Sequence, residues 1–275
     1  MKVTLPQRVG IGLAILAAVA AALYGAALGF IALRQEALLF APQVLDAGYR
    51  FDRGPDVRET WVDVPGARLN ALHMKLPKPV GVVFFLHGNG GSLDSWFVDI
   101  DFYRRANFDL FMIDYRGYGK SSGRIESEAQ LHADARAAWQ QIAPQYAGLR
   151  RVFLGRSLGS GLAAALAADV QPELTILVSP YISMQALAAE HYPWVPSGLL
   201  RYPLRTDQAL PHIRGELLLV HGDQDRLIPP AHSQALLRLA PNTQVARLAI
   251  VPGAAHNNLQ KFPVYREQLL LSLRP

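Results

Sequence analysis

The sequence predicts an α/β protein with a mostly parallel, doubly wound sheet, preceded by one membrane-spanning helix. Three observations lead to this prediction. Short apolar runs, typical of buried parallel strands, alternate with helical patterns over most of the chain. One long uncharged run lies near the N-terminus. Glycine-rich turns follow several of the apolar runs, at the strand ends where open α/β sheets bind ligands.

The composition excludes several classes of protein. Hydrophobic residues make up 51% of the 275 residues and charged residues 18%, which excludes a disordered chain. The absence of cysteine excludes a disulfide scaffold, a Cys-based metal site and a thiol nucleophile. The net charge of +5 comes from scattered basic residues, so nucleic acid is not expected as a partner.

The N-terminal uncharged run predicts a membrane anchor over residues 1–34, with the transmembrane part at about 9–33. At about 1.5 Å per residue, a helix of this length spans the roughly 30 Å hydrocarbon core. A cleaved signal peptide is an alternative, because Ala26 and Ala27 suit a signal peptidase, although its apolar part is normally only about 7–15 residues long. A buried core helix is a second alternative.

The charges that flank the uncharged run bear on topology. Lys2 and Arg8 precede the run, and Arg34, Arg50 and Arg53 follow it, so the charge count alone does not decide. A short basic tail before a long apolar run usually stays in the cytoplasm. This predicts that the rest of the chain lies on the extracytoplasmic side.

The remaining chain predicts a linker and lead-in at 35–59 and a single domain at 60–275. The expected strands are residues 60–64, 69–75, 80–87, 109–114, 151–154, 175–179, 216–221 and 247–251. The expected helices are residues 93–106, 126–142, 158–170, 232–239 and 258–273. The first two strands flank a Pro-Gly turn, which predicts an antiparallel hairpin at one edge of the sheet.

Residues 155–159, GRSLG, carry the main functional signal, because they join an expected strand to an expected helix. Small residues there permit a sharp turn that lifts the Ser157 hydroxyl above the sheet, at the positive end of the helix. Ser157 is therefore the candidate nucleophile, with an ordinary helix-capping serine as the alternative. Arg156 is expected to form a salt bridge with the loop at residues 114–123, which is interpreted as structural support for this turn.

Residues 87–91, HGNGG, follow another buried strand and are interpreted as an oxyanion loop. Backbone N–H groups stabilise an oxyanion when they are aimed in advance. The amides of Asn89 and Leu158 are the expected donors, and a glycine turn without chemistry is the alternative.

A carboxylate and a histidine would complete this constellation. Asp223 and Asp225 both follow the strand at 216–221, and Asp225 is favoured because the tight turn leaves it facing back toward the sheet. Asp223 then stabilises the turn. Among the eight histidines, only His256 lies in a loop after the last expected strand, which gives the chain order Ser, Asp, His.

As a set, these motifs resemble the α/β-hydrolase superfamily, and within it the membrane-anchored alpha/beta-hydrolase-domain proteins. The matching segments are residues 87–91, 114–123, 155–161, 221–229 and 253–258, in the family's order. The resemblance implies an α/β-hydrolase fold and a serine esterase, lipase or thioesterase without a cofactor or metal. Ala254 and Ala255 stand where the family commonly has glycine.

An insertion at about residues 181–214 resembles the small helical cap of this superfamily. Tyr181, Met184, Tyr192 and Trp194 are expected to line an acyl-chain pocket; alternatively, they only pack the cap onto the domain.

The sequence thus predicts a membrane-anchored serine hydrolase that cleaves esters or thioesters of acyl or lipid-like substrates. An aminopeptidase or amidase is one alternative, and it needs an acid for the substrate amine, for which the cap offers Glu190 and Asp207. A non-catalytic membrane scaffold that retains the fold is the other.

Overall fold

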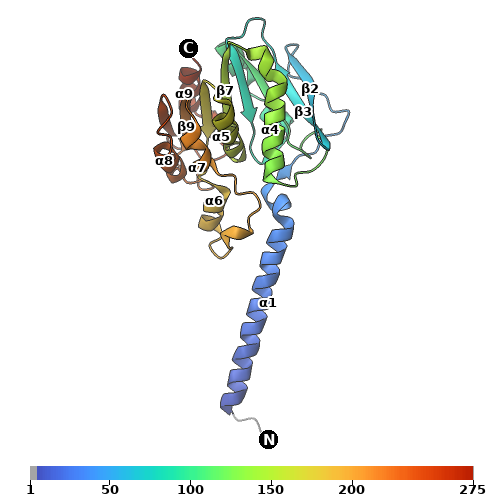
Figure 1. Ribbon diagram of the computed structural model, residues 1–275, viewed down its shortest axis with the longest axis vertical. Helices are drawn as coiled ribbons and strands as arrows, with labels where there is room; N and C mark the ends of the chain where they lie inside the picture. Colours follow the sequence, from blue (N-terminus) through green and yellow to red (C-terminus); the bar gives the residue numbers. More distant parts are fainter. Residues whose placement is uncertain (1–4, 275) are drawn as a thin grey trace.

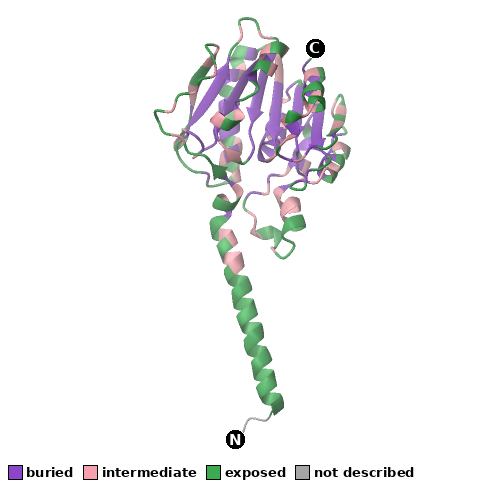
Figure 2. Cartoon of the chain, turned by 180° about the vertical axis from the view of Figure 1, so that it is seen from behind, coloured by how far each residue is buried: buried purple, intermediate pink, exposed green. Residues whose placement is uncertain are grey.

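The computed structural model describes residues 5–274, so Lys2 of the expected anchor lies outside the described residues. One long helix, α1 (Leu5–Leu39), projects from a layered α/β domain (Figure 1), and it is kinked at Arg34, whose φ of −117° and ψ of 16° are not helical. It is long and apolar enough to cross a membrane, and no part of its most apolar stretch is buried in the protein (Figure 2). The buried-core alternative therefore does not describe this helix.

An eight-stranded sheet forms the centre of the domain. Its strands lie in the order β10-β9-β8-β7-β4-β6-β3-β2. Their bounds are β2 (Val57–Val64), β3 (Ala67–Met74), β4 (Gly81–Leu86), β6 (Phe108–Ile113), β7 (Arg150–Arg156), β8 (Leu174–Val178), β9 (Glu216–Gly222) and β10 (Ala246–Val251). From β10 to β6 every neighbouring pair is parallel, and β2 with β3 forms the predicted antiparallel hairpin at the edge.

Helices cover both faces of the sheet, as the doubly wound prediction requires. Every residue of β4 is buried, with Val82, Phe84 and Leu86 in one hydrophobic cluster and Val83 and Phe85 in the other. The first cluster contains side chains of α4 (Glu128–Ile142), α5 (Leu158–Val170) and α8 (Ala231–Arg238). The second contains side chains of α2 (Leu93–Trp96), α3 (Ile100–Ala106) and α9 (Pro263–Leu273). Single turns of 3-10 helix, η1 (Ala143–Tyr146) and η4 (Leu259–Lys261), adjoin α4 and α9.

The prediction of one continuous helix over residues 93–106 is wrong, because the helix is broken between residues 96 and 100. The segment forms α2 and α3, because Asp99 adopts a left-handed conformation with φ 54° between them. The break lets Trp96 turn toward the glycine loop, where its Nε1 donates to the Gly90 carbonyl at 2.6 Å. Ile100 and Tyr103 can then pack into the core from a new helix axis.

The cap and a small second sheet lie at the end of the domain near α1 (Figure 1). The cap contains α6 (Met184–His191), η2 (Ser197–Leu199), α7 (Thr206–Ala209) and η3 (Leu210–His212). Within the expected linker, β1 (Ala41–Pro42) pairs in parallel with β5 (Gly90–Gly91).

His73 on β3 belongs to a buried polar chain. Its Nε2 lies 2.6 Å from the Tyr146 hydroxyl, which donates to Asp109 Oδ2 at 2.6 Å. Burial, followed by the charges of Lys75 and Arg58, lowers the pKa of His73 from 6.5 to about 4. Between these two values the unfolded chain binds a proton that the folded chain does not, so stability present above the unfolded pKa is lost as pH falls.

As the pH falls from about 7.5 to about 5, we therefore expect the titration of His73 to lower the free energy of unfolding by about 2 kcal/mol. Urea unfolding at both pH values measures this change. The variant His73→Gln keeps an N–H donor for Tyr146 but does not titrate, so its unfolding free energy should lose this part of the pH dependence. An unchanged pH dependence in the variant would contradict the assignment.

Candidate active site

Ser157 occupies a sharp, strained turn between β7 and α5. Its φ of 51° and ψ of −122° lie where few residues other than glycine are found. The turn is held by the Ser157 N–H, which donates to the Val178 carbonyl at 2.9 Å. The two motif glycines permit close backbone approach: a Cβ at Gly155 would lie 2.4 Å from the Gly159 carbonyl oxygen, and a Cβ at Gly159 would lie 2.1 Å from that of Leu86.

The structure brings Ser157, His256 and Asp225 into one line of hydrogen bonds. His256 Nε2 lies 3.0 Å from Ser157 Oγ, and His256 Nδ1 lies 2.7 Å from Asp225 Oδ2. The second carboxylate oxygen, Oδ1, accepts the N–H groups of Leu227 and Ile228 at 3.0 and 2.8 Å. These bonds fix the carboxylate, so it can hold the imidazole in one orientation.

The two candidate aspartates have different surroundings. Burial alone would raise the pKa of Asp225, but hydrogen bonds from His221, His256 and the Ile228 N–H hold it well below its usual range. Asp225 therefore stays ionised beside the histidine. Asp223 instead accepts the Gly253 N–H at 2.7 Å, and so braces the loop that carries His256.

The loop at residues 87–91 lies against Ser157, since a Cβ added to Gly88 would be 3.6 Å from Ser157 Cβ. His87 Nδ1 donates to the carbonyl oxygen of Gly88 at 2.7 Å. Because the peptide unit is planar and trans, this bond also fixes the direction of the Asn89 N–H, opposite to the Gly88 carbonyl. Within residues 5–274, neither the Asn89 nor the Leu158 amide donates a turn or loop hydrogen bond, so both are available to a ligand.

Two tyrosines of the loop at 114–123 donate hydrogen bonds to the loop at 87–91, the candidate oxyanion loop. The Tyr115 hydroxyl donates to the His87 carbonyl at 2.8 Å, and the Tyr118 hydroxyl donates to the Asn89 carbonyl at 2.5 Å. Both side chains are buried. These contacts agree with the interpretation of residues 114–123 as structural support.

Strand β1 supports the same loop from the other side. The Ala41 N–H donates to the Asn89 carbonyl at 3.0 Å, and the Gln43 N–H donates to the Gly91 carbonyl at 2.8 Å. A strand of two residues carries no periodicity, so the sequence gives no signal for it.

The expected salt bridge between Arg156 and the loop at 114–123 is wrong. The Arg156 guanidinium donates to the His256 carbonyl at 2.9 Å and to Gln260 Oε1 at 3.2 Å, and lies over the Trp96 ring at 5.2 Å. The arginine of the loop itself, Arg116, pairs with Asp134 at 2.6 Å. Arg156 therefore ties the nucleophile turn to the histidine loop.

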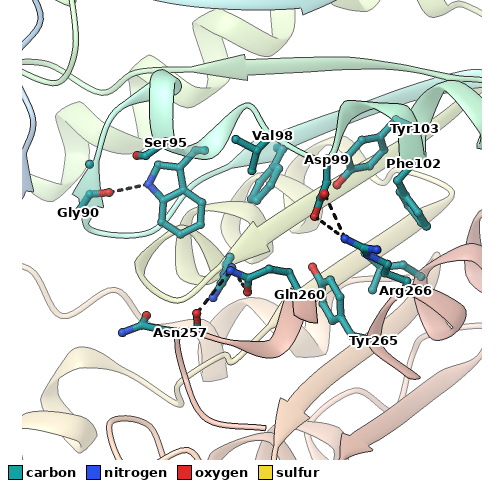
Figure 3. A pocket seen from close by; sticks show the side chains of 15 residues that line it. Gly90, Ser95, Val98, Asp99, Phe102, Tyr103, Asn257, Gln260, Tyr265 and Arg266 are labelled. Atoms are coloured by element: carbon teal, nitrogen blue, oxygen red, sulfur yellow. Dashed lines mark hydrogen bonds and ion pairs between the residues drawn. The ribbon is translucent and has the colours of Figure 1, made fainter. Parts of the chain in front are cut away.

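A cavity of about 370 Å³ lies between the segments around α2, α3 and α9 (Figure 3), and none of Ser157, Asp225 and His256 lines it. Arg156 and Asn257, the sequence neighbours of Ser157 and His256, are in its wall. Most of the remaining wall is apolar or aromatic and comes from the segments around α2, α3 and α9, including Trp96, Phe102, Tyr103, Tyr265 and Leu269. Sequence reasoning missed this cavity because its walls come from helices far apart in the chain.

The four cap residues expected to bind substrate lie in different surroundings. Tyr181 is fully buried, and its hydroxyl donates to the Leu158 carbonyl at 2.9 Å. Met184 is half-buried against the core. Tyr192 and Trp194 are exposed, and Trp194 contacts α1. None of the four lines the cavity in Figure 3, so their role in binding stays a prediction.

Over the part of the chain that the structure describes, no group of three or more His, Cys, Asp or Glu side chains is arranged to hold a metal ion.

Comparisons with known proteins agree with this geometry. A family model described as serine aminopeptidase, S33, matches residues 77–205. Alpha/beta hydrolase domain-containing protein 17B of Xenopus laevis is 30% identical over 211 residues, which cover 74% of this chain and 70% of that protein. An uncharacterized Mycobacterium tuberculosis protein is 34% identical over 154 residues; the match spans about half of each chain, 54% and 53% respectively.

Solved structures share the fold at low sequence identity. An esterase of Pyrococcus furiosus matches with a TM-score of 0.67 at 18% identity, over 85% of this chain and 97% of that one. A predicted hydrolase of Thermoplasma acidophilum matches with a TM-score of 0.56 at 22% identity, over 79% and 96%. The 30% identity to the alpha/beta hydrolase domain-containing protein shows that the chain belongs to the α/β-hydrolase superfamily, and the sheet order and the strained serine turn agree with it.

Proposed function

We propose that this hydrolase is a membrane-anchored serine enzyme that cleaves carboxylic ester or thioester bonds of acyl or lipid-like substrates. The observation that carries the proposal is the hydrogen-bonded line from Ser157 through His256 to Asp225, at the carboxyl ends of the parallel strands. In this arrangement a serine hydroxyl gains a base, and the base gains a carboxylate that fixes its tautomer.

The reaction follows from these positions. Ser157 Oγ attacks the acyl carbon while His256 Nε2 takes the hydroxyl proton, and the carbonyl electrons move to the oxygen. The Asn89 and Leu158 amides receive that oxyanion. When the carbon–oxygen or carbon–sulfur bond of the substrate breaks, His256 protonates the leaving alcohol or thiol. Water, deprotonated by His256, then attacks the acyl-enzyme and releases the acid.

Three features support an acyl substrate. The cavity that reaches Arg156 and Asn257, the sequence neighbours of Ser157 and His256, has aromatic walls that suit a hydrocarbon chain. The apolar helix α1 would hold the enzyme at a membrane, where acyl lipids are concentrated. One protein of similar fold is named as an esterase. Turnover of short- and long-chain acyl esters measures this preference, and strict preference for acetyl esters would contradict it.

The family model's description raises the aminopeptidase alternative. That activity needs a free carboxylate for the substrate amine. Glu190 lies 3.2 Å from His232 Nε2, and Asp207 lies 2.6 Å from Arg205 in an ion pair. Because both cap carboxylates have partners, the ester or thioester proposal is favoured.

A fluorophosphonate probe tests the proposed nucleophile, because it reacts with activated serines. We expect it to label Ser157 in the full-length protein, located by mass spectrometry, and to leave the variant Ser157→Ala unlabelled. The variant Ser197→Ala, changed at an exposed cap serine, serves as the matched control and should label like the wild type. No labelling of folded wild-type protein would favour the non-catalytic scaffold.

We further propose that the hydrolase domain lies on the extracytoplasmic side, with the short basic tail in the cytoplasm. A C-terminal reporter that is active only outside the cytoplasm measures this topology. Reporter activity confined to the cytoplasm would reverse it.

A further inference from the structure

The end of the cap lies beside the apolar part of α1. The Tyr24 hydroxyl donates to the Trp194 carbonyl oxygen at 2.9 Å, and the two rings meet edge to face with centroids 6.4 Å apart. Tyr24 lies within the uncharged run, and the next charged residue along the chain is Arg34. At about 1.5 Å per residue, these two positions are about 15 Å apart along the helix. The cap therefore reaches well into the level of the apolar run.

Polar contacts between the cap and the end of α1 fix this arrangement. Gln35, which is buried, donates from Nε2 to the Leu199 carbonyl at 2.7 Å and accepts the Arg201 N–H at 2.8 Å. Glu36 forms an ion pair with Arg201 and accepts the Tyr202 hydroxyl at 2.7 Å. These bonds join residues 199–202 of the cap to the turn of α1 that follows Arg34, and the Tyr24–Trp194 contact joins an earlier part of the cap to the apolar run of the helix.

The cap end itself has the chemistry of a membrane boundary. Residues 192–200, YPWVPSGLL, contain no charged side chain. Tyr192 and Trp194 expose 57% and 47% of their surface although both are large aromatic residues. Trp and Tyr are the residues that gather where head groups meet acyl chains.

The backbone of the cap end is also suited to surroundings of low polarity, where an unpaired N–H is costly. Pro193 and Pro196 have no N–H to satisfy. Several other N–H groups of this segment donate to carbonyls of the cap, namely those of Tyr192, Val195, Leu199 and Leu200.

We propose that residues 192–200 insert into the interface of the bilayer that α1 spans. This inference rests on the membrane anchoring proposed above. Amphipathic segments that bind in this way bury their apolar face about 5–10 Å below the head groups. Arg34, exposed and about 15 Å further along the helix than Tyr24, then lies at the outer, water-facing side of the head groups. The cap and α1 form one membrane-contacting surface.

This placement sets the direction from which substrate arrives. The cap begins after the carboxyl end of β8, and β1 joins α1 to the loop that follows β4. The strand ends that carry Ser157 therefore face the same side as α1 (Figure 1). An acyl ester embedded in the membrane would meet the cap before it meets any other part of the domain.

Site-directed spin labelling tests the insertion, because the chain has no native cysteine. Three single-cysteine variants of the full-length protein are placed in phosphatidylcholine vesicles. Ser197→Cys probes the exposed cap end and leaves both aromatic residues in place. Val19→Cys, half exposed on α1, probes the anchor. Val80→Cys, at the amino end of β4 and 42% exposed, is the matched control far from the membrane.

We expect the spin labels at 197 and 19 to be accessible to dissolved oxygen, which increases their relaxation rate, and to be shielded from a water-soluble nickel chelate. The label at 80 should show the opposite order of accessibility. If the label at 19 is shielded while the label at 197 is as open to the chelate as the label at 80, insertion of the cap is wrong and the anchor stands. A label at 19 that is open to the chelate overturns the anchoring and the insertion together.

Discussion

The variant Asp225→Asn is expected to lower kcat for an acyl ester by about 10⁴-fold, because it forces His256 into the wrong tautomer. Asp225 Oδ1 accepts the N–H groups of Leu227 and Ile228, so the amide oxygen of asparagine must take that position. The amide NH2 then faces His256 Nδ1 and donates to it. The imidazole proton moves to Nε2, which can no longer accept the proton of Ser157.

Asp223→Asn is the matched control for this experiment, since it makes the same chemical change two residues away. Asparagine can still accept the Gly253 N–H through its side-chain oxygen, so kcat should stay within a few-fold of the wild type. Circular dichroism of both variants checks that the fold is retained. Equal losses in the two variants would contradict the separate roles of the two aspartates.

Among substitutions that add a single methyl group to the site, Gly159→Ala is expected to cause the largest loss of stability and activity. Its Cβ would lie 2.1 Å from the Leu86 carbonyl oxygen and 2.5 Å from that of His87. Both atoms are backbone at the end of the central strand β4, so relief requires α5 or the oxyanion loop to move. We expect a loss of about 3 kcal/mol in unfolding free energy. Where protein still folds, kcat should fall by about 10²-fold or more, as when one oxyanion donor is lost.

Gly161→Ala, two residues further along α5, provides the comparison. There the added Cβ would lie 2.5 Å from the hydroxyl of Tyr181, a side-chain atom, and 3.3 Å from its ring carbon. A shift of this ring, together with the gain of about 1 kcal/mol from alanine in a helix, should make the net change smaller. Thermal unfolding and ester turnover, measured for both variants, test whether Gly159→Ala has the larger effect. A wild-type melting temperature and rate for Gly159→Ala would show that the close approach is not required.

Much of the fold could be predicted because its determinants are local. Buried parallel strands are continuous apolar runs, and β4, β7, β8 and β9 were placed from such runs alone. Ser157, Asp225 and His256 were selected because each follows a strand, and parallel strands bring their carboxyl ends to one edge. The structure places His256 within hydrogen-bond distance of both Ser157 and Asp225.

The features that could not be predicted depend on contacts between distant segments. Arg156 bonds a backbone carbonyl about one hundred residues away, and a carbonyl leaves no mark in the sequence. The aromatic cavity is formed by helices on either side of the site, whose spacing in the chain has no pattern. The break at Asp99 interrupts an apolar pattern that continues on both sides, so periodicity did not reveal it.

Because strand β1 pairs with the loop that carries Asn89, a proteolytic cut before β1 and a cut after β1 have different consequences for the active site. Cleavage near Ala26 and Ala27 would remove most of the apolar helix but leave residues 41–43 paired with the loop that carries Asn89. A cut beyond Gln43 would take two backbone hydrogen bonds from that loop. A shed form that begins before Phe40 would therefore keep both hydrogen bonds to the loop at residues 87–91, whereas a domain cut at its first long strand would lose them.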